Sequence, residues 1–100
     1  PAEVAKTLTG KVAKKYKPRG NSKYYSWTLE GAPKDYLQSA DEAIIEKMDE
    51  AGRNASLITV HFFESVNGEY TNRRIVEVKP AEGAEQEGGD AQEPEEEVGQ

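Results

Sequence analysis

The chain has 100 residues and contains no cysteine, one histidine and one tryptophan. The absence of cysteine excludes disulfides, thiolate zinc sites and a cysteine nucleophile. His61 has no second histidine to share a metal with, and no EF-hand spacing, phosphate-binding glycine loop or Ser-His-Asp set is present. We therefore expect that the protein is not an enzyme and that it binds no cofactor and no metal.

Long apolar runs are also missing. The mean hydropathy is −0.87, which is low even for a soluble chain. No segment approaches the roughly 18 apolar residues that cross a bilayer, and the start PAEVAKTLTG lacks the apolar centre of a signal peptide. We expect a cytoplasmic protein with no membrane partner.

Charge is distributed unevenly along the chain, whose net charge is −6. Residues 80–100 hold eight acids, no base and no aromatic, which leaves 13 bases and 11 acids in residues 1–79. A segment of that composition cannot bury enough apolar surface to offset the entropy of ordering it. The sequence predicts one folded domain over 1–79 and a disordered acidic tail over 80–100.

The N-terminal half shows strand periodicity. Residues 7–16 and 23–30 alternate in side-chain type, and the loop composition of residues 17–22 separates them. Gly10 lies inside the first of these strands, where glycine is typical of a bulge or a sharp bend. Asp35–Gln38 is predicted to be a short third strand.

A helix of about three turns follows. Ser39 with Glu42 three residues later fits a capping box, and Gly52 suits the left-handed position after a helix. The helix has a single apolar stripe, formed by Ile44, Ile45, Met48 and Ala51.

The remaining segment predicts a hairpin. Residues 56–64 and 69–79 are rich in β-formers, and Asn67-Gly68 between them is typical of a two-residue type I′ turn. The predicted order is therefore three strands, one helix and two strands.

This order resembles the OB-fold, a mainly β, five-stranded, partly open Greek-key barrel with one helix between strands 3 and 4. The resemblance covers about residues 5–79 and includes the glycine in the first strand. An SH3-like barrel lacks the helix at that place, and a ferredoxin-like fold needs a helix where KPRGNS stands.

The stretch KVAKKYKPRGNSKYYSWTLEG, residues 11–31, concentrates six cations, three tyrosines and the only tryptophan. Cations that track phosphates and rings that stack on bases are what single-strand binding requires. In an OB-fold, this stretch lines the oligonucleotide groove. The candidate phosphate-binding residues are Lys14, Lys15, Lys17, Arg19, Lys23 and Arg74, and the candidate base-stacking residues are Tyr16, Tyr24, Trp27 and Tyr36.

Several of these positions have two interpretations. Trp27 shares its strand face with a leucine, so it is either a core residue or a stacking residue. Phe62 and Phe63 face opposite ways, and one belongs to the core while the other is exposed or contacts a second copy. Arg73 and Arg74 also face opposite sides, so that one reaches the groove and the other pairs with an acid.

The acidic tail adds to the resemblance, because bacterial and phage single-stranded DNA-binding proteins pair an OB domain with a disordered acidic C-terminus. The chain resembles the phage members of this family most. The resemblance implies a DNA replication protein that binds single-stranded DNA with little sequence preference. It implies further that Glu82–Gln100 compete for the groove and recruit replication or repair proteins, although the ending EEEVGQ lacks the family's apolar tip.

Two alternatives stay open at this point. One is an RNA-binding OB domain, and the other is a phage protein-interaction module that binds a host factor. The oligomeric state is open as well, since small OB proteins often dimerise to gain a second binding surface.

Overall fold

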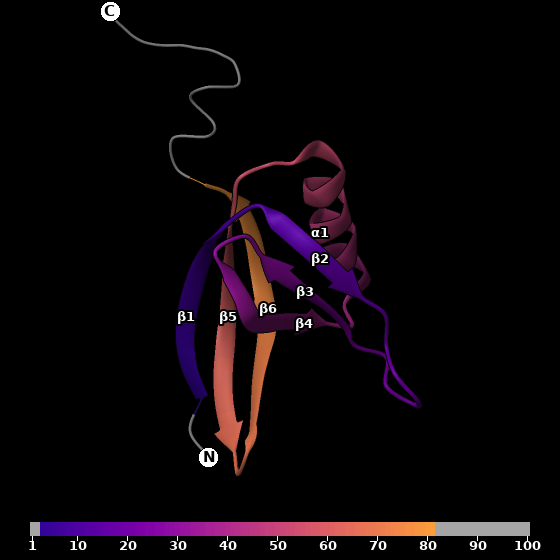
Figure 1. Ribbon diagram of the computed structural model, residues 1–100, viewed down its shortest axis with the longest axis vertical. Helices are drawn as coiled ribbons and strands as arrows, with labels where there is room; N and C mark the ends of the chain where they lie inside the picture. The colour runs from indigo at the N-terminus through magenta and orange to yellow at the C-terminus, as the bar shows by residue number, and fades with distance from the viewer. Residues whose placement is uncertain (1–2, 82–100) are drawn as a thin grey trace, which may run out of the picture.

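The computed structural model describes residues 3–81, which form six strands and one helix (Figure 1). Residues 82–100, nearly all of the predicted disordered tail, lie outside the described residues. The elements are β1 (Glu3–Gly10), β2 (Val12–Tyr16), β3 (Tyr25–Leu29), β4 (Ala32–Ser39), α1 (Glu42–Asn54), β5 (Ile58–Asn67) and β6 (Tyr70–Pro80). Within this part of the chain, no helix is long and apolar enough to cross a membrane.

The strands form one mixed sheet in the order β1-β5-β6-β4-β3-β2. All neighbours are antiparallel except β4 and β6, which run parallel where Gln38 lies opposite Arg74. The mainly β class and the helix after the third predicted strand are confirmed. The predicted five-stranded barrel is corrected to an open six-stranded sheet over residues 3–81. The sixth strand is present because the predicted first strand is divided at Lys11.

The division lies directly after Gly10, where the sequence predicted a bulge or a sharp bend. A Cβ atom at Gly10 would lie 3.1 Å from the backbone oxygen of Glu30. The Glu30 N–H donates to the Lys11 carbonyl at 2.8 Å. The chain therefore leaves β5 and joins β3 within one residue, at a point where any side chain would be crowded by backbone.

The β5–β6 turn lies one residue later than predicted, and the third predicted strand is longer. Asn67 pairs with Tyr70, so the two-residue turn is Gly68-Glu69 rather than Asn67-Gly68. Of the two turn residues, only Gly68 has a positive φ, of 66°. This is the type II′ pattern and not the predicted type I′. The third predicted strand is also longer, because β4 begins at Ala32 directly after a tight turn.

The predicted capping box of α1 is wrong. The N-cap is Asp41, whose carboxylate accepts from the backbone N–H groups of Ala43 and Ile44 at 2.9 and 3.3 Å. The Ser39 hydroxyl accepts from the Asp41 N–H at 3.0 Å instead. A carboxylate one residue before the first turn thus displaces the hydroxyl as the cap.

The C-terminal end of α1 also corrects the prediction. The helix continues through Gly52 to Asn54, and the left-handed residue is Ala55, with φ of 52°. Gly52 instead faces β2, where an added Cβ would be 3.7 Å from a Val12 methyl carbon.

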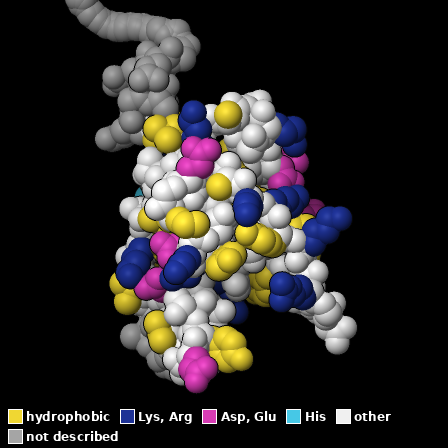
Figure 2. All heavy atoms as spheres, in the orientation of Figure 1, with side chains coloured by type: hydrophobic (Ala, Val, Ile, Leu, Met, Phe, Trp, Pro, Cys, Tyr) yellow, Lys and Arg dark blue, Asp and Glu magenta, His cyan; other side chains and the backbone are white. Residues whose placement is uncertain are grey.

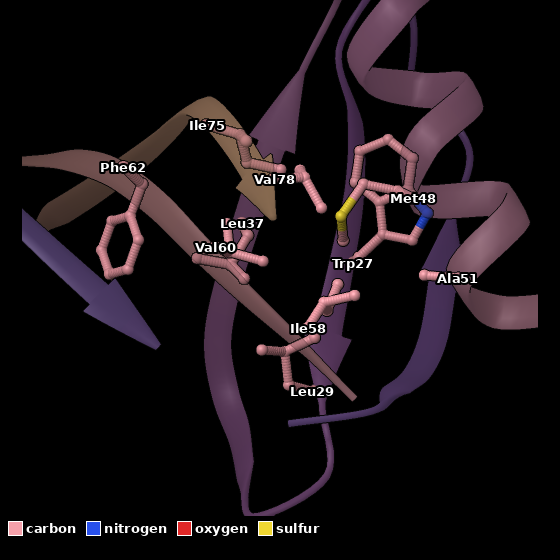
Figure 3. Packing of buried hydrophobic residues seen from close by; sticks show 10 residues of the cluster. All are labelled: Trp27, Leu29, Leu37, Met48, Ala51, Ile58, Val60, Phe62, Ile75 and Val78. Carbon is pink, nitrogen blue, oxygen red and sulfur yellow. The ribbon is translucent and has the colours of Figure 1, made fainter. Parts of the chain in front are cut away.

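The core lies between α1 and the face of the sheet turned toward it (Figure 3). Trp27, Leu37 and Met48 are fully buried, and Figure 3 shows the Met48 sulfur against the Trp27 ring. The predicted apolar stripe of the helix is confirmed, since Met48 and Ala51 are buried and both isoleucines pack against the cluster. Ala81 is buried as well and donates its N–H to the Leu57 carbonyl at 3.1 Å. The folded part therefore extends two residues beyond Lys79.

Replacing Ala55 with glycine is expected to raise the free energy of unfolding by about 1 kcal/mol, because a left-handed L-residue costs roughly 1–2 kcal/mol that glycine does not pay. Urea denaturation measures the change. The matched control is Ala43→Gly within the helix, which is expected to lower stability by about 0.5–1 kcal/mol. A loss of stability in both variants would contradict the left-handed assignment.

Candidate nucleic-acid interface

Strand alternation sends one set of side chains to the face of the sheet opposite the core, which we call the outer face. Tyr16 lies opposite Ser26, Ser26 opposite Gln38, and Gln38 opposite Arg74. These four residues come from β2, β3, β4 and β6. The register therefore builds a continuous row of aromatic, polar and cationic side chains across four strands.

A hollow of about 520 Å³ lies on this row, and we call it the tyrosine hollow. It is lined by Tyr16, Lys17, Arg19, Ser22, Tyr24, Ser26, Tyr36, Gln38 and Asn72. Five of these residues were predicted as interface residues from the sequence. The hollow combines the predicted loop cations with tyrosines from three segments of the chain.

The tyrosines are held in defined positions but stay accessible. Tyr16 and Tyr36 pack edge to face, with ring centroids 5.4 Å apart and planes at 69°. They are 37% and 46% exposed. The Arg74 guanidinium lies 5.2 Å from the centroid of the Tyr24 ring. Mutual packing fixes the rings while leaving surface on which a flat ligand can stack.

The cations at this site are not neutralised by neighbouring acids. Across residues 3–81, Lys17, Arg19 and Arg74 form no ion pair, and neither do Lys14 and Lys23. Lys14 lies two residues before Tyr16 on β2, and Lys23 precedes Tyr24. Figure 2 shows Lys and Arg side chains gathered where Figure 1 draws β2 and the segment after it. The site can therefore attract a polyanion.

Two predicted residues do not reach the interface. Trp27 is 0% exposed in the core, so its core interpretation holds and it cannot stack on a base in this arrangement. Lys15 alternates with Tyr16 and points to the helix side, where it pairs with Asp49 at 3.0 Å and lies over the Tyr25 ring. A helix packed on the inner face thus removes every second residue of β2 and β3 from the site.

The polar floor of the hollow was missed by the sequence analysis. Its neutral groups come from Ser22, Ser26, Gln38 and Asn72. Ser26 and Gln38 lie two residues after Tyr24 and Tyr36, so strand alternation could have predicted that they share a face with these tyrosines. Asn72 enters only through the parallel pairing of β4 with β6, for which the sequence carries no local signal.

Arg73 behaves as the acid-paired member of the two adjacent arginines. It lies 3.0 Å from Glu64 and 3.3 Å from Asp35, and Lys6 also donates to Glu64 at 2.6 Å. This charge cluster, formed by Lys6, Asp35, Glu64 and Arg73, joins β1, β4, β5 and β6. The hydrogen bond from Lys6, with the nearby Arg73 charge, lowers the pKa of Glu64 below its ordinary value of 4.5. Arg74 is consequently the arginine left for the interface.

Comparison of the chain with protein family models, curated proteins and solved structures finds no significant match. Among residues 3–81, no group of three or more His, Asp and Glu side chains is arranged to hold a metal ion. The features of residues 3–81 that bear most directly on function are therefore the tyrosine hollow and the charges around it.

Replacing Glu64 with glutamine is expected to lower stability at neutral pH. Because the folded state lowers the pKa of Glu64, its contribution is complete above pH 4.5 and is lost as the pH falls through the lowered value. Urea denaturation across this range should show the two proteins converging at acidic pH. Glu77→Gln, at an exposed pair 3.7 Å from Lys79, is the control and should change little at any pH. A Glu64→Gln deficit that grows on acidification would contradict the assignment.

Proposed function

We propose that the protein binds single-stranded DNA with little sequence preference through the tyrosine hollow. The observation that carries the proposal is that three tyrosines and two cations, Lys17 and Arg19, line one hollow with a neutral polar floor, while Arg74 lies against the Tyr24 ring. None of these cations forms an ion pair within residues 3–81. Base stacking on aromatic rings and phosphate contact by cations are together sufficient for binding that tolerates any sequence.

A single strand fits this arrangement better than a duplex. The rings can stack only on bases whose faces are free, and duplex bases are stacked on one another. Ser26, Gln38 and Asn72 offer hydroxyl and amide groups to base edges that are unpaired in a single strand.

We propose in addition that the sheet is an OB-type Greek key in which β1 and β2 are the two halves of one bent first strand. Three observations support this: the bend at Gly10, the parallel pairing of β4 with β6, and the position of α1 after β4. An OB-fold binds oligonucleotides on its second and third strands, the loop between strands 1 and 2 and the loop between strands 4 and 5. The two strands and the first of these loops correspond here to β3, β4 and residues 17–24, which supply most of the tyrosine hollow.

The acidic segment 82–100 is proposed to compete with DNA for the same cations. All eight of its acids follow Ala81, and a tethered polyanion acts as a high local concentration of competitor. A role in phage DNA replication, with the segment recruiting replication or repair proteins, belongs to the same proposal.

Alanine at Tyr16 or Tyr36 is expected to weaken binding of a fluorescently labelled oligothymidine by about 1–3 kcal/mol for each stacked base lost. Fluorescence anisotropy at low salt measures the affinity. Val4→Ala is the control, since Val4 is 51% exposed on β1 and lies outside the hollow.

The same titrations distinguish the alternatives. Tighter binding of a matched oligouridine would favour an RNA-binding domain. Absence of binding to either strand at low salt would reject the nucleic-acid proposal and favour a protein-interaction module.

Ending the chain at Ala81 is expected to tighten DNA binding, most strongly at low salt, where electrostatic competition is least screened. The truncation keeps Pro80 and Ala81, which are part of the fold. Anisotropy on the full and shortened chains measures the effect. Equal affinities would contradict competition by the segment while leaving the tyrosine hollow untouched.

A further inference from the structure

Phe63 lies on the same outer face as the tyrosine hollow, one strand further along. In the β5–β6 register it is directly opposite Arg74, and directly opposite residues of an antiparallel pair share a face. Phe63 is 41% exposed, whereas its neighbour Phe62 is 3% exposed in the core. Of the two adjacent rings, Phe63 is therefore the one available to a ligand.

Arg74 connects Phe63 to the hollow. Its guanidinium lies 5.2 Å from the Tyr24 ring on one side, and its cross-strand neighbour on the other side is Phe63. The outer face thus presents a cation between two aromatic side chains. This alternation of ring and cation repeats the combination found in the tyrosine hollow.

The face of Phe63 is not covered by the next strand. Its partner on β1 is Ala5, whose single methyl group cannot cover a phenyl ring. A second hollow of about 520 Å³ lies beside it and is lined in part by Thr7, His61 and Val76. Space for a flat group therefore exists against the ring.

We infer that Phe63 is a further base-stacking platform for the same single strand, so that the interface extends from β2 across β3, β4 and β6 to β5. The inference rests on the proposed function. Tyr36 on β4 and Phe63 on β5 are separated by two strand spacings, or about 10 Å. That span is about three times the 3.4 Å rise per nucleotide of a stacked strand. A dinucleotide has a single step between its two bases, so it cannot occupy both platforms.

The test compares Phe63→Ala with the full wild-type chain on two oligothymidines. Affinity for a decanucleotide is expected to fall by about 5- to 150-fold, the loss typical of one stacked base. Affinity for a dinucleotide in the tyrosine hollow should not change. Val66→Ala, at another exposed position on β5, is the control and should leave both affinities unchanged.

A second variant gives a direct signal. In Phe63→Trp the fluorescence of the added indole is expected to be quenched by the decanucleotide, because a base stacks on it. The native Trp27 is buried and contributes a constant background, so the change can be assigned to the added indole. Wild-type affinity of Phe63→Ala for the decanucleotide would overturn the inference, while the Tyr16 and Tyr36 variants still test the proposed function. Dissociation of a dimer by Phe63→Ala without loss of affinity would also overturn it and assign the ring to a contact between copies.

Discussion

The change of direction at Gly10 and Lys11 gives the sheet both of its edges. One continuous segment supplies both edge strands, β1 beside β5 and β2 beside β3. This is possible because Gly10 has no side chain where the Glu30 backbone passes, and because the Lys11 carbonyl accepts the Glu30 N–H. The reversal brings β2, with its lysines and Tyr16, alongside β3 and places the following loop beside the outer face.

Separation of the two sheet faces then follows from alternation. The inner face gives Trp27 and Leu37 to the core under α1, and Lys15 to Asp49. The outer face keeps polar and aromatic side chains that the core does not use. As Asp49 binds Lys15, so the charge cluster around Glu64 binds Arg73. Its neighbour Arg74 lies over the Tyr24 ring instead. Within residues 3–81, the ion pairs of Lys15 and Arg73 thus leave Arg74 and the loop cations without an acidic partner on the outer face.

Local patterns predicted much of this from the sequence. The bend at Gly10, the apolar stripe of α1 and most of the hollow lining follow from residue type and spacing. The wrong predictions arise where a neighbouring residue takes the predicted role. Asp41 caps the helix in place of Ser39, and Ala55 takes the left-handed position assigned to Gly52. The β5–β6 turn is likewise shifted by one residue. The floor residue Asn72 and the exposure of Phe63 depend on long-range register between strands, which no local pattern encodes.

We propose that nucleic acid binds on the outer face of the sheet. The most direct test is an NMR titration of the ¹⁵N-labelled full chain with oligothymidine, following each backbone amide. Binding on the outer face should give shift changes centred on Ser26, Gln38 and Asn72, with the amides of α1 largely unchanged. Changes centred on α1, or none anywhere at low salt, would contradict it.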